Sequence, residues 1–332
     1  MKRLVSGIKP TGSLTLGNYI GALRQFVKLQ DELEDTEFFI FIADLHAITT
    51  PQEKQALKKS IKSIAALYIA CGLDPNKVNL FVQSEVVEHA VLGYIMESTA
   101  YVGEMERMTQ YKDKKQKQTE GIRTSLLTYP ALMAADILLY DADIVPIGDD
   151  QKQHLELTRN LAQRFNHLYG DTFVVPEGFF PKTGARIKSL TEPDKKMDKS
   201  AENQKAYILL LDDLNQVKNK IRSAVTDSDT TIKYDLKNKA GISNLLQIYA
   251  SLTDLSIKDI ELKYKDSSYK EFKENLADIV ADTLKPIQER YHEIINSPYL
   301  DEVLDQGRQR ASEIARKKMF KVYKRIGLGR VK

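Results

Sequence analysis

Short apolar runs alternate with stretches of helical periodicity along the first 90 residues. The apolar runs lie at residues 3–8, 37–49 and 78–86, and each is expected to form a buried strand. Between them, helices are expected from Leu16 to about Leu33 and from Pro51 to near Gly72. This βαβ series predicts an α/β fold with a doubly wound parallel sheet, which binds ligands at the carboxyl ends of its strands.

The next part of the chain is predicted to be mostly helical. Helical periodicity dominates residues 88–170, interrupted by one apolar strand at 142–148. A basic run inside this region is expected to form a loop. Its lysines are Lys112, Lys114, Lys115 and Lys117. Residues 172–200 contain three prolines, so loops and short strands are expected there.

The C-terminal part is predicted to be helical from about Tyr207 onward, with turns at Gly241 and at Ser297-Pro298. We therefore expect two domains. A Rossmann-like nucleotide-binding domain would span residues 1–206, with a helical insertion at about 88–140. A helical domain would span residues 207–332, and its last helix could return to the first domain.

Composition limits the class of protein. Hydrophobic residues make up 42% and charged residues 29% of the 332 residues, which suits packed domains rather than disorder. The single cysteine, Cys71, excludes a disulfide framework, and the spacing of Cys and His fits no metal site. The chain has neither a membrane-length apolar run nor a secretory signal, so a cytoplasmic protein is expected.

Basic residues are concentrated at the C-terminus, although the net charge of the whole chain is only +3. Ten lysines and arginines lie between residues 308 and 332, beside a single acid, Glu313. Together with the basic run near residue 115, this patch fits a polyanionic partner. Solvated helix faces have the same composition and remain the alternative.

The turn after the first strand contains several glycines in the sequence GIKPTGSLTLGNY. Gly17 and Asn18 fall in the first turn of the following helix, where free N–H groups and the helix dipole suit a phosphate. The spacing is neither that of a dinucleotide-binding fingerprint nor that of a P-loop. An ordinary helix start capped by Thr15 is the alternative, and the residues alone favour neither.

Asp136 stands in an unusually apolar helix, LLTYPALMAADILLY. A buried carboxylate must accept hydrogen bonds, so Asp136 either pairs inside the protein or accepts a donor from a ligand. The next strand ends in IGDDQKQH. This sequence places Gly148, Asp149, Asp150 and Gln151 at the carboxyl end of the sheet, where a doubly wound fold binds ligands.

Lysines crowd into the stretch DKKMDKSAENQ, where Lys195, Lys196 and Lys199 surround Met197 and Asp198. A solvated surface loop explains such a run. A phosphate clamp explains it as well, because ammonium groups on flexible stems are good partners for phosphate. A clamp that acts as charge grows on a leaving pyrophosphate would speed the reaction rather than tighten substrate binding.

Several motifs together resemble one family. TLGN at residues 15–18 and KMDKS at 196–200 look like the HIGH and KMSKS signatures of class I aminoacyl-tRNA synthetases, with TLGN in the form of the tryptophan branch. Over its whole length, the chain resembles the bacterial tryptophanyl-tRNA synthetases. The segments that carry the resemblance, in the same order, are SGIKPTGSLTLGNYIGALRQF, QSEV, GEMERMTQYK, LLTYPALMAADILLY, GDDQKQHLELTR and the closing GLGR. Because many separate motifs agree, this likeness is more specific than either signature alone.

The resemblance implies a tryptophan-tRNA ligase. Such an enzyme activates L-tryptophan with ATP and Mg2+ to give tryptophanyl-adenylate and pyrophosphate, and then passes the tryptophanyl group to the 3′ end of tRNA(Trp). The carboxylate of the amino acid itself attacks the α-phosphate, so catalysis rests on positioning and charge stabilisation. The family further implies an anticodon-binding role for the helical domain and a homodimer formed through the region near residues 88–140.

The resemblance also assigns residues to the two substrates. The ATP site would comprise Lys9, Pro10, Thr11, Gly17, Asn18, Gly148, Asp149, Asp150, Ile187, Lys196, Met197, Asp198, Lys199 and Ser200. Four residues would act in catalysis, namely Lys196, Lys199, Asn18 and Lys114, with Lys115 as a competitor of Lys114. The tryptophan site would comprise Asp136, Tyr129, Met133, Gln151, Val145, Ile147, Val5 and His46.

Within the tryptophan site, Asp136 would accept the indole N–H, which is the only polar group of that side chain. Tyr129 and Gln151 would hold the ammonium and carboxylate ends of the amino acid, and the apolar members of the set would form a slot for the ring. A buried acceptor left unpaired by phenylalanine would discriminate against that amino acid by roughly 10⁴-fold or more.

Three positions depart from the family pattern. Asp198 replaces the central Ser of KMSKS and could pair with a neighbouring lysine, Lys9 stands where Gln is more common, and Ala201 stands where an acid is common. Three alternatives share the fold: a tyrosyl-tRNA synthetase, another adenylate-forming nucleotidyltransferase and an inactive RNA-binding paralogue. MAAD and TLGN favour tryptophan, the helical domain and basic patches favour RNA, and the retained lysines of KMDKS favour an active enzyme.

Overall fold

Five parallel strands form the central sheet, in the order β3-β2-β1-β4-β5. The computed structural model describes residues 1–10, 12–115, 121–148, 151–179 and 186–330. The strands are β1 (Lys2–Ile8), β2 (Thr36–Ile42), β3 (Val78–Val82), β4 (Ile144–Pro146) and β5 (Glu177–Phe179). All neighbouring strands run parallel, with Leu4 of β1 opposite Phe38 of β2 and Ile144 of β4. The predicted doubly wound parallel sheet is therefore confirmed.

Successive side chains of each strand point to opposite faces of the sheet, and each face has its own core. On one face, Leu4 and Phe38 belong to a buried cluster that includes α4 (Lys54–Ala70) and continues into the C-terminal helices. On the other face, Val5, Phe39 and Phe81 pack in a cluster with four helices. These are α5 (Glu88–Thr99), α8 (Thr124–Leu138), α9 (Lys152–Tyr169) and α14 (Pro298–Ile326). The sheet is thus covered on both sides, so the ends of its strands are the part of the sheet that helices do not bury.

The helices before residue 170 occur in the expected regions, with local differences. They are α1 (Leu16–Asn18), α2 (Arg24–Glu32), α3 (Asp44–Ala47), α4 (Lys54–Ala70), α5 (Glu88–Thr99), α6 (Val102–Glu106), α7 (Thr109–Lys115), α8 (Thr124–Leu138) and α9 (Lys152–Tyr169). A π-helical turn, η1 (Tyr19–Leu23), joins α1 to α2, and a 3-10 turn, η2 (Gln83–Glu85), follows β3.

Two local predictions were wrong. The basic run was expected to form a loop, but Lys112, Lys114 and Lys115 lie in α7, because lysine is a good helix former and Tyr111 gives the helix a buried anchor. His46 was expected at the end of a strand, but β2 already ends at Ile42 and His46 lies in the short helix α3. Lys117 lies outside the described residues.

The C-terminal helices are separated by one long irregular segment that was predicted to be helical. The elements are η4 (Gln204–Ala206), α10 (Leu214–Arg222), α11 (Ala240–Thr253), α12 (Ile257–Lys263), α13 (Tyr269–Ile294) and α14 (Pro298–Ile326). The turn at Ser297-Pro298 is confirmed. Gly241 was expected in a turn but lies in the first turn of α11, where a Cβ would overlap the carbonyl oxygen of Val225.

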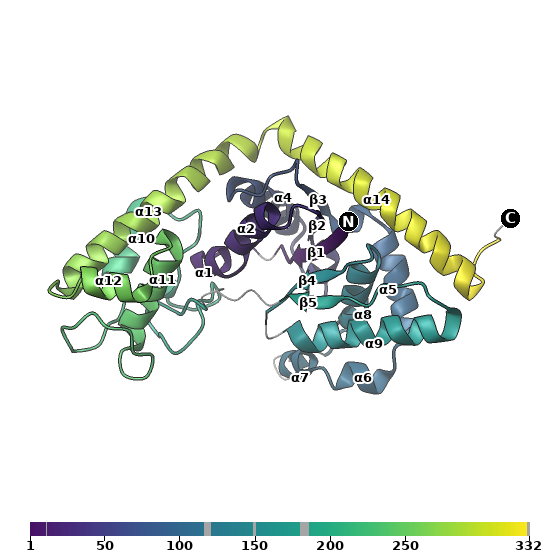
Figure 1. Cartoon of the computed structure of the whole chain (residues 1–332), viewed down its shortest axis with the longest axis horizontal. Helices are drawn as coiled ribbons and strands as arrows, with labels where there is room; N and C mark the ends of the chain where they lie inside the picture. The colour runs from purple at the N-terminus through teal and green to yellow at the C-terminus, as the bar shows by residue number, and fades with distance from the viewer. Residues whose placement is uncertain (11, 116–120, 149–150, 180–185, 331–332) are drawn as a thin grey trace.

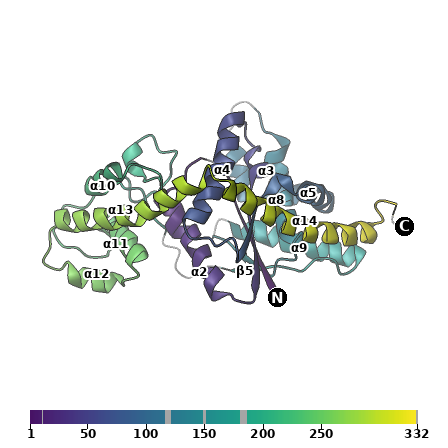
Figure 2. The same ribbon diagram turned by 90° about the horizontal axis from the view of Figure 1, so that it is seen from above.

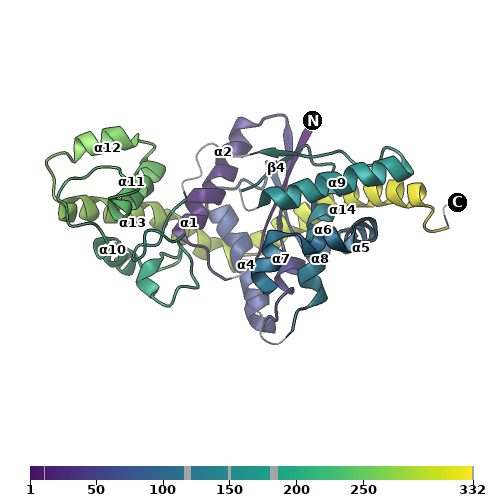
Figure 3. The ribbon, with the colours of Figure 1, turned by 90° about the horizontal axis from the view of Figure 1, so that it is seen from below.

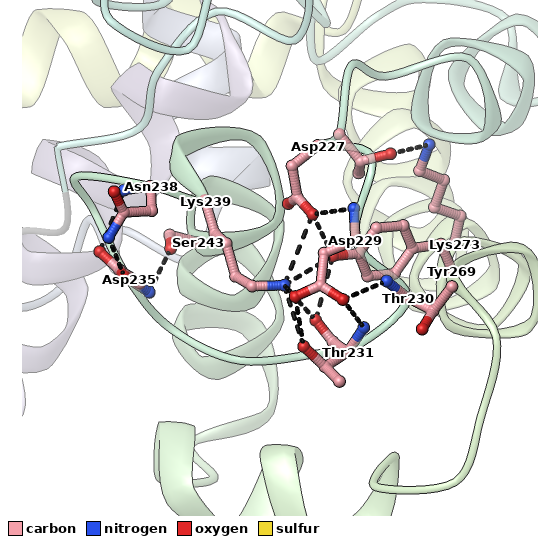
Figure 4. A network of polar contacts seen from close by, with 11 residues as sticks. Asp227, Asp229, Thr230, Thr231, Asp235, Asn238, Lys239, Ser243, Tyr269 and Lys273 are labelled. Atoms are coloured by element: carbon pink, nitrogen blue, oxygen red, sulfur yellow. Dashed lines mark hydrogen bonds and ion pairs between the residues drawn. The ribbon is translucent and has the colours of Figure 1, made fainter.

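The irregular segment 223–239 is held by polar side chains rather than by a regular ladder (Figure 4). The ammonium group of Lys239 lies 2.7 Å from a carboxylate oxygen of Asp229 and 2.9 Å from the carbonyl oxygen of Thr231. The Tyr269 hydroxyl donates to Asp227 over 2.8 Å. Because the Val225 N–H donates to the Leu190 carbonyl over 2.8 Å, this braced segment also supports the chain that leads to residue 196.

The two longest helices connect the two parts of the molecule. In Figure 1, α13 rises from the group α10–α12, and α14 descends beyond the sheet toward α5. Figures 2 and 3 show α2 and α4 between the group α10–α12 and the helices α5–α9. Helix α14 packs directly on the sheet, since a Cβ at Gly307 would overlap the backbone of Leu80 in β3. None of the helices in the described ranges has the length and apolarity that a membrane span requires.

Candidate active site

A cavity of about 410 Å³ lies at the carboxyl ends of β1 and β4. This is the edge of a doubly wound sheet at which ligands bind. The structure brings together in its lining all eight residues that the sequence assigned to tryptophan, from β1, α3, α8 and the segment around β4. They are Val5, His46, Tyr129, Met133, Asp136, Val145, Ile147 and Gln151.

Asp136 is the charged group at the buried side of this cavity, with only 2% of its surface exposed. Its Oδ1 lies 2.7 Å from Nε2 of Gln83 and 2.6 Å from Nδ1 of His89, and its Oδ2 lies 2.8 Å from Nε2 of His46. Burial alone would raise the pKa of Asp136, but the hydrogen bonds from the two histidines lower it to about 2. The carboxylate is therefore ionised at neutral pH, and the three nitrogen atoms act as donors to it.

A second layer of polar groups lies behind Asp136. Nε2 of His89 lies 2.7 Å from the hydroxyl of Tyr140, whose ring stacks on Phe39 at a centroid distance of 4.7 Å. Sequence reasoning did not select Gln83, His89 or Tyr140. Gln83 directly follows β3, and a polar residue at this strand end could have been selected from the sequence as a site residue. His89 was set aside because no metal spacing surrounded it.

Tyr129 and Gln151 bring further polar groups to the cavity lining, together with Gln110. The Tyr129 hydroxyl lies 2.8 Å from Nε2 of His154 and 3.3 Å from Oε1 of Gln110. Burial raises the pKa of Tyr129, so its phenol stays protonated. The cavity therefore combines an apolar slot with an ionised acceptor and a separate set of neutral polar groups.

The residues assigned to ATP fall into several groups. Lys9 and Gly148 line the same cavity, and the ammonium group of Lys9 lies 3.3 Å from Oγ1 of Thr49. Pro10 follows Lys9 and is buried. Thr11, Asp149 and Asp150 lie outside the described residues. Lys114 lies in α7, but its side chain and that of Lys115 are also outside the described part of the chain, so the choice between them stays a prediction.

The TLGN motif forms a capped helix start. Oγ1 of Thr15 accepts a hydrogen bond from the Asn18 N–H over 3.2 Å, and Oδ1 of Asn18 accepts one from the Thr15 N–H over 3.0 Å. This reciprocal pair is a capping box, so Asn18 has at least a structural role. Gly17 lies against the KMDKS segment, since a Cβ there would be 3.6 Å from the Cβ atoms of both Ile187 and Met197.

The KMDKS segment is anchored through Met197, which is buried. The Met197 N–H donates to the Ile187 carbonyl over 3.1 Å, and Lys188 and Lys196 form an antiparallel bridge. The ammonium group of Lys199 lies against the first glycine turn, 3.2 Å from where a Cβ of Gly12 would stand. Partial burial lowers the pKa of Lys199. The structure thus brings the two signature motifs side by side.

Asp198 does not pair with either signature lysine. Its Oδ1 accepts hydrogen bonds from the backbone N–H and the hydroxyl of Ser200, each over 2.9 Å. These bonds tie the Asp198 carboxylate to the local turn and lower its pKa, and the charges of Lys196 and Lys199 lower it further. Among the described residues no ion pair joins it to Lys196 or Lys199. Lys196 and Ser200 are exposed.

Comparison with known proteins identifies the family. The family model described as tRNA synthetases class I (W and Y) matches residues 1–285. A tryptophan–tRNA ligase of Oceanobacillus iheyensis is 58% identical over 330 residues, which cover 99% of this chain and 100% of that relative.

Two solved structures have the same architecture. The tryptophanyl-tRNA synthetase of Mycoplasma pneumoniae matches with a TM-score of 0.90 at 40% identity, over 99% of this chain and 98% of that one. The tryptophanyl-tRNA synthetase of Campylobacter jejuni, solved with ADP and tryptophan, matches with a TM-score of 0.84 at 36% identity, over 98% of this chain and all of that one. The chain therefore belongs to the family of class I tRNA synthetases for tryptophan and tyrosine.

Proposed function

We infer that the protein is a tryptophan–tRNA ligase, which activates L-tryptophan with ATP and transfers it to tRNA(Trp). The observation that carries this conclusion is the ionised, buried Asp136 at one side of an apolar slot. Full-length relatives at 53–58% identity bear this name, which disfavours the tyrosine alternative. An inactive paralogue is disfavoured because Lys196 and Lys199 of the signature are retained.

The cavity suits an amino acid with one ring N–H. Oδ2 of Asp136 accepts the indole N–H beside the bond from His46, while the apolar side chains of Met133, Val145 and Ile147 pack on the ring. Tyr129 and Gln151 hold the ammonium and carboxylate ends. Phenylalanine leaves the carboxylate without its ligand donor, and such a mismatch discriminates by roughly 10⁴-fold or more.

ATP lies across the first glycine turn, Gly17 and the KMDKS segment, since these elements are adjacent. A carboxylate oxygen of tryptophan attacks the α-phosphorus, and the bond from that phosphorus to the bridging oxygen breaks. The electron pair leaves with pyrophosphate, and the ammonium groups of Lys196 and Lys199 stabilise the charge that develops there. No proton has to be removed from the attacking carboxylate, so no general base is required.

Magnesium belongs to the nucleotide in this proposal. Among the described residues no group of three or more His, Cys, Asp or Glu side chains is placed to hold a metal ion. Mg2+ commonly keeps several waters and is bound through substrate phosphates rather than by an all-protein cage. We therefore expect it to arrive with ATP and to neutralise part of the phosphate charge.

In the second step a ribose hydroxyl at the 3′ end of tRNA attacks the carbonyl carbon of the adenylate, and AMP leaves. The helical domain, residues 207–332, is the part that we assign to the anticodon. The lysines and arginines of α14 provide charge for the phosphate backbone. Such an enzyme works where translation takes place, which fits the expected cytoplasmic location.

The homodimer is assigned to the helical insertion. Exposed apolar side chains gather on α5 and around the start of α6, namely Val87, Val91, Tyr94, Tyr101 and Val102. Several large apolar side chains exposed on consecutive helices are typical of an interaction site. Tyr94→Glu should convert the dimer to a monomer in sedimentation velocity, whereas Tyr299→Glu, a change at an exposed tyrosine of α14, should leave it unchanged. A wild-type monomer at all concentrations would remove the dimer from the proposal.

The experiment that tests the function is amino-acid-dependent exchange of pyrophosphate into ATP, with tryptophan and tyrosine compared. Exchange with tryptophan alone is expected. Exchange with tyrosine alone would keep the mechanism and overturn the pocket assignment, and exchange with neither would favour the inactive paralogue. The chain contains no tryptophan, so the fluorescence of bound tryptophan can be measured against a background of tyrosine alone.

A further inference from the structure

The carboxylate of Asp136 has almost all of its acceptor positions occupied by protein donors. An ionised carboxylate offers about four lone-pair positions, two on each oxygen. Gln83 and His89 occupy both positions of Oδ1, and His46 occupies one position of Oδ2. One position of Oδ2 is therefore left, on the carboxylate that lines the cavity.

We propose that Gln83, His89 and Tyr140 are positioning residues that fix the Asp136 carboxylate so that it presents a single acceptor to the ring of the substrate. None of the three lines the cavity, so they act only through Asp136. The inference rests on the proposed role of Asp136 toward the indole N–H and deepens it. In this proposal, selection for a substrate with a ring N–H depends on Gln83, His89 and Tyr140 as well as on Asp136, and Asp136 is the member that contacts the substrate.

The direction of each bond in this chain follows from the ionised carboxylate. Because the carboxylate can only accept, Nδ1 of His89 and the amide nitrogen of Gln83 must donate. Burial and the charge of Asp136 raise the pKa of Tyr140, so its hydroxyl keeps its proton and can donate to Nε2 of His89 over 2.7 Å. Such a bond favours the arrangement in which the ring hydrogen of His89 that faces Asp136 is on Nδ1.

Gln83 supports the same orientation. Its side chain is fully buried, and its Oε1 has no hydrogen-bond partner among the described residues. Rotation of the amide by 180° would place that oxygen against the negative charge of Asp136. The observed orientation gives the carboxylate a donor and leaves the Gln83 carbonyl oxygen unpaired. The hydrogen bond to the charged Asp136 therefore outweighs the cost of that unpaired oxygen.

The chain is held in place by aromatic packing. The ring of His89 lies 5.5 Å from that of Phe41 and 6.0 Å from that of Phe81, and Tyr140 stacks on Phe39. These phenylalanines come from β2 and β3, whereas Asp136 comes from α8, Tyr140 from the turn that follows α8, and His89 from α5. The position of Oδ2 is therefore fixed by the sheet and two helices together, and not by α8 alone.

The test compares tryptophan with an isostere that lacks the ring N–H, β-(3-benzothienyl)alanine, in the pyrophosphate-exchange assay. The ratio of the two kcat/KM values should be roughly 10⁴ for the wild type. Tyr140→Phe should lower this ratio about 3-fold and His89→Leu about 10-fold, by raising the KM for tryptophan and leaving the KM for ATP unchanged. His89→Asn, whose amide can replace the Nδ1 donor, should restore most of the ratio.

Tyr249→Phe is the matched control, since it removes a buried hydroxyl from α11 in the C-terminal domain and should leave the ratio unchanged. If Tyr140→Phe and His89→Leu lower the rates with both amino acids equally, the three residues only support the fold and the proposal is wrong. If His89→Leu does not fold, Tyr140→Phe still decides, because it keeps the ring that stacks on Phe39. A wild type that does not distinguish the two amino acids would instead contradict the role proposed for Asp136 itself.

Discussion

The amino-acid cavity and the KMDKS segment are built in opposite ways. Around Asp136 the donors Gln83 and His89 are fully buried and lie within 2.7 Å of the carboxylate. In the KMDKS segment Lys196 and Ser200 are exposed, and one buried side chain, Met197, anchors the whole stretch. One region is buried among its hydrogen-bond partners, whereas the other is held by one buried side chain and a short backbone bridge.

This difference matches the ligands that the two regions are proposed to bind. A buried acceptor discriminates between amino acids because an unpaired polar group in a closed site is costly. Ammonium groups on flexible stems make little distinction between anions, but they can follow a triphosphate as its charge moves toward the leaving group. Selectivity should therefore depend on the fixed region and rate on the flexible one.

The largest expected effect is on selectivity and follows from Asp136→Asn. The amide keeps the shape of the carboxylate but removes its charge. It also places an NH2 donor against the side chains that donate to Asp136 in the wild type. The preference for tryptophan over phenylalanine, measured as the ratio of kcat/KM in pyrophosphate exchange, should fall by about 10³-fold. The surface change Asp254→Asn is the control and should leave it unchanged. An unaltered preference in Asp136→Asn would contradict the conclusion that selectivity depends on the buried amino-acid cavity.

The next effect is on rate and follows from Lys199→Ala. Loss of one donor to the developing charge should slow single-turnover formation of the adenylate by about 10²-fold, with little change in tryptophan binding. Lys195→Ala should have almost no effect, since that exposed lysine is paired with Glu192. Equal rates for Lys199→Ala and wild type would leave the lysine stretch as an ordinary solvated surface.

A smaller effect is expected on stability at acid pH. The pKa of Asp136 is lowered from 3.8 to about 2 on folding, so its contribution is fully present above pH 4 and is lost as the pH falls through 2. The contribution is about 2 kcal/mol in the free energy of unfolding. Urea unfolding of wild type and Asp136→Asn should therefore show a gap in stability that narrows by this amount between pH 4 and pH 2. A constant gap would mean that the carboxylate gains nothing from its histidine partners.

The smallest effect is expected from Asp198→Ser, which restores the usual central residue of KMSKS. Because the Asp198 carboxylate is tied to Ser200 and not to a lysine, adenylate formation should change by less than about 3-fold. A large increase in rate would show that the acid restrains the lysines, and the segment would then be less free than its exposure suggests.

The sheet could be predicted from the sequence because its strands are continuous apolar runs separated by helical periodicity. The grouping of eight residues around one cavity could be predicted from family motifs, although their roles toward tryptophan stay predictions. The layer behind Asp136 could not be predicted. Gln83 and His89 lie 53 and 47 positions away from it along the chain, so no local pattern connects them. Segment 223–239 was missed for a related reason, since its order comes from Lys239 and its partners rather than from periodicity.

The close approach of Gly307 to Leu80 has a consequence for the order of folding during translation. The cavity lining is complete once residue 151 has left the ribosome, but α14, which covers β3, begins about 150 residues later, at Pro298. At a synthesis rate of 5–20 residues per second, the nascent sheet would remain without α14 for roughly 8 to 30 s. We therefore expect the unfinished chain to expose the apolar face of β3 throughout this interval and to be a client of chaperones until α14 docks.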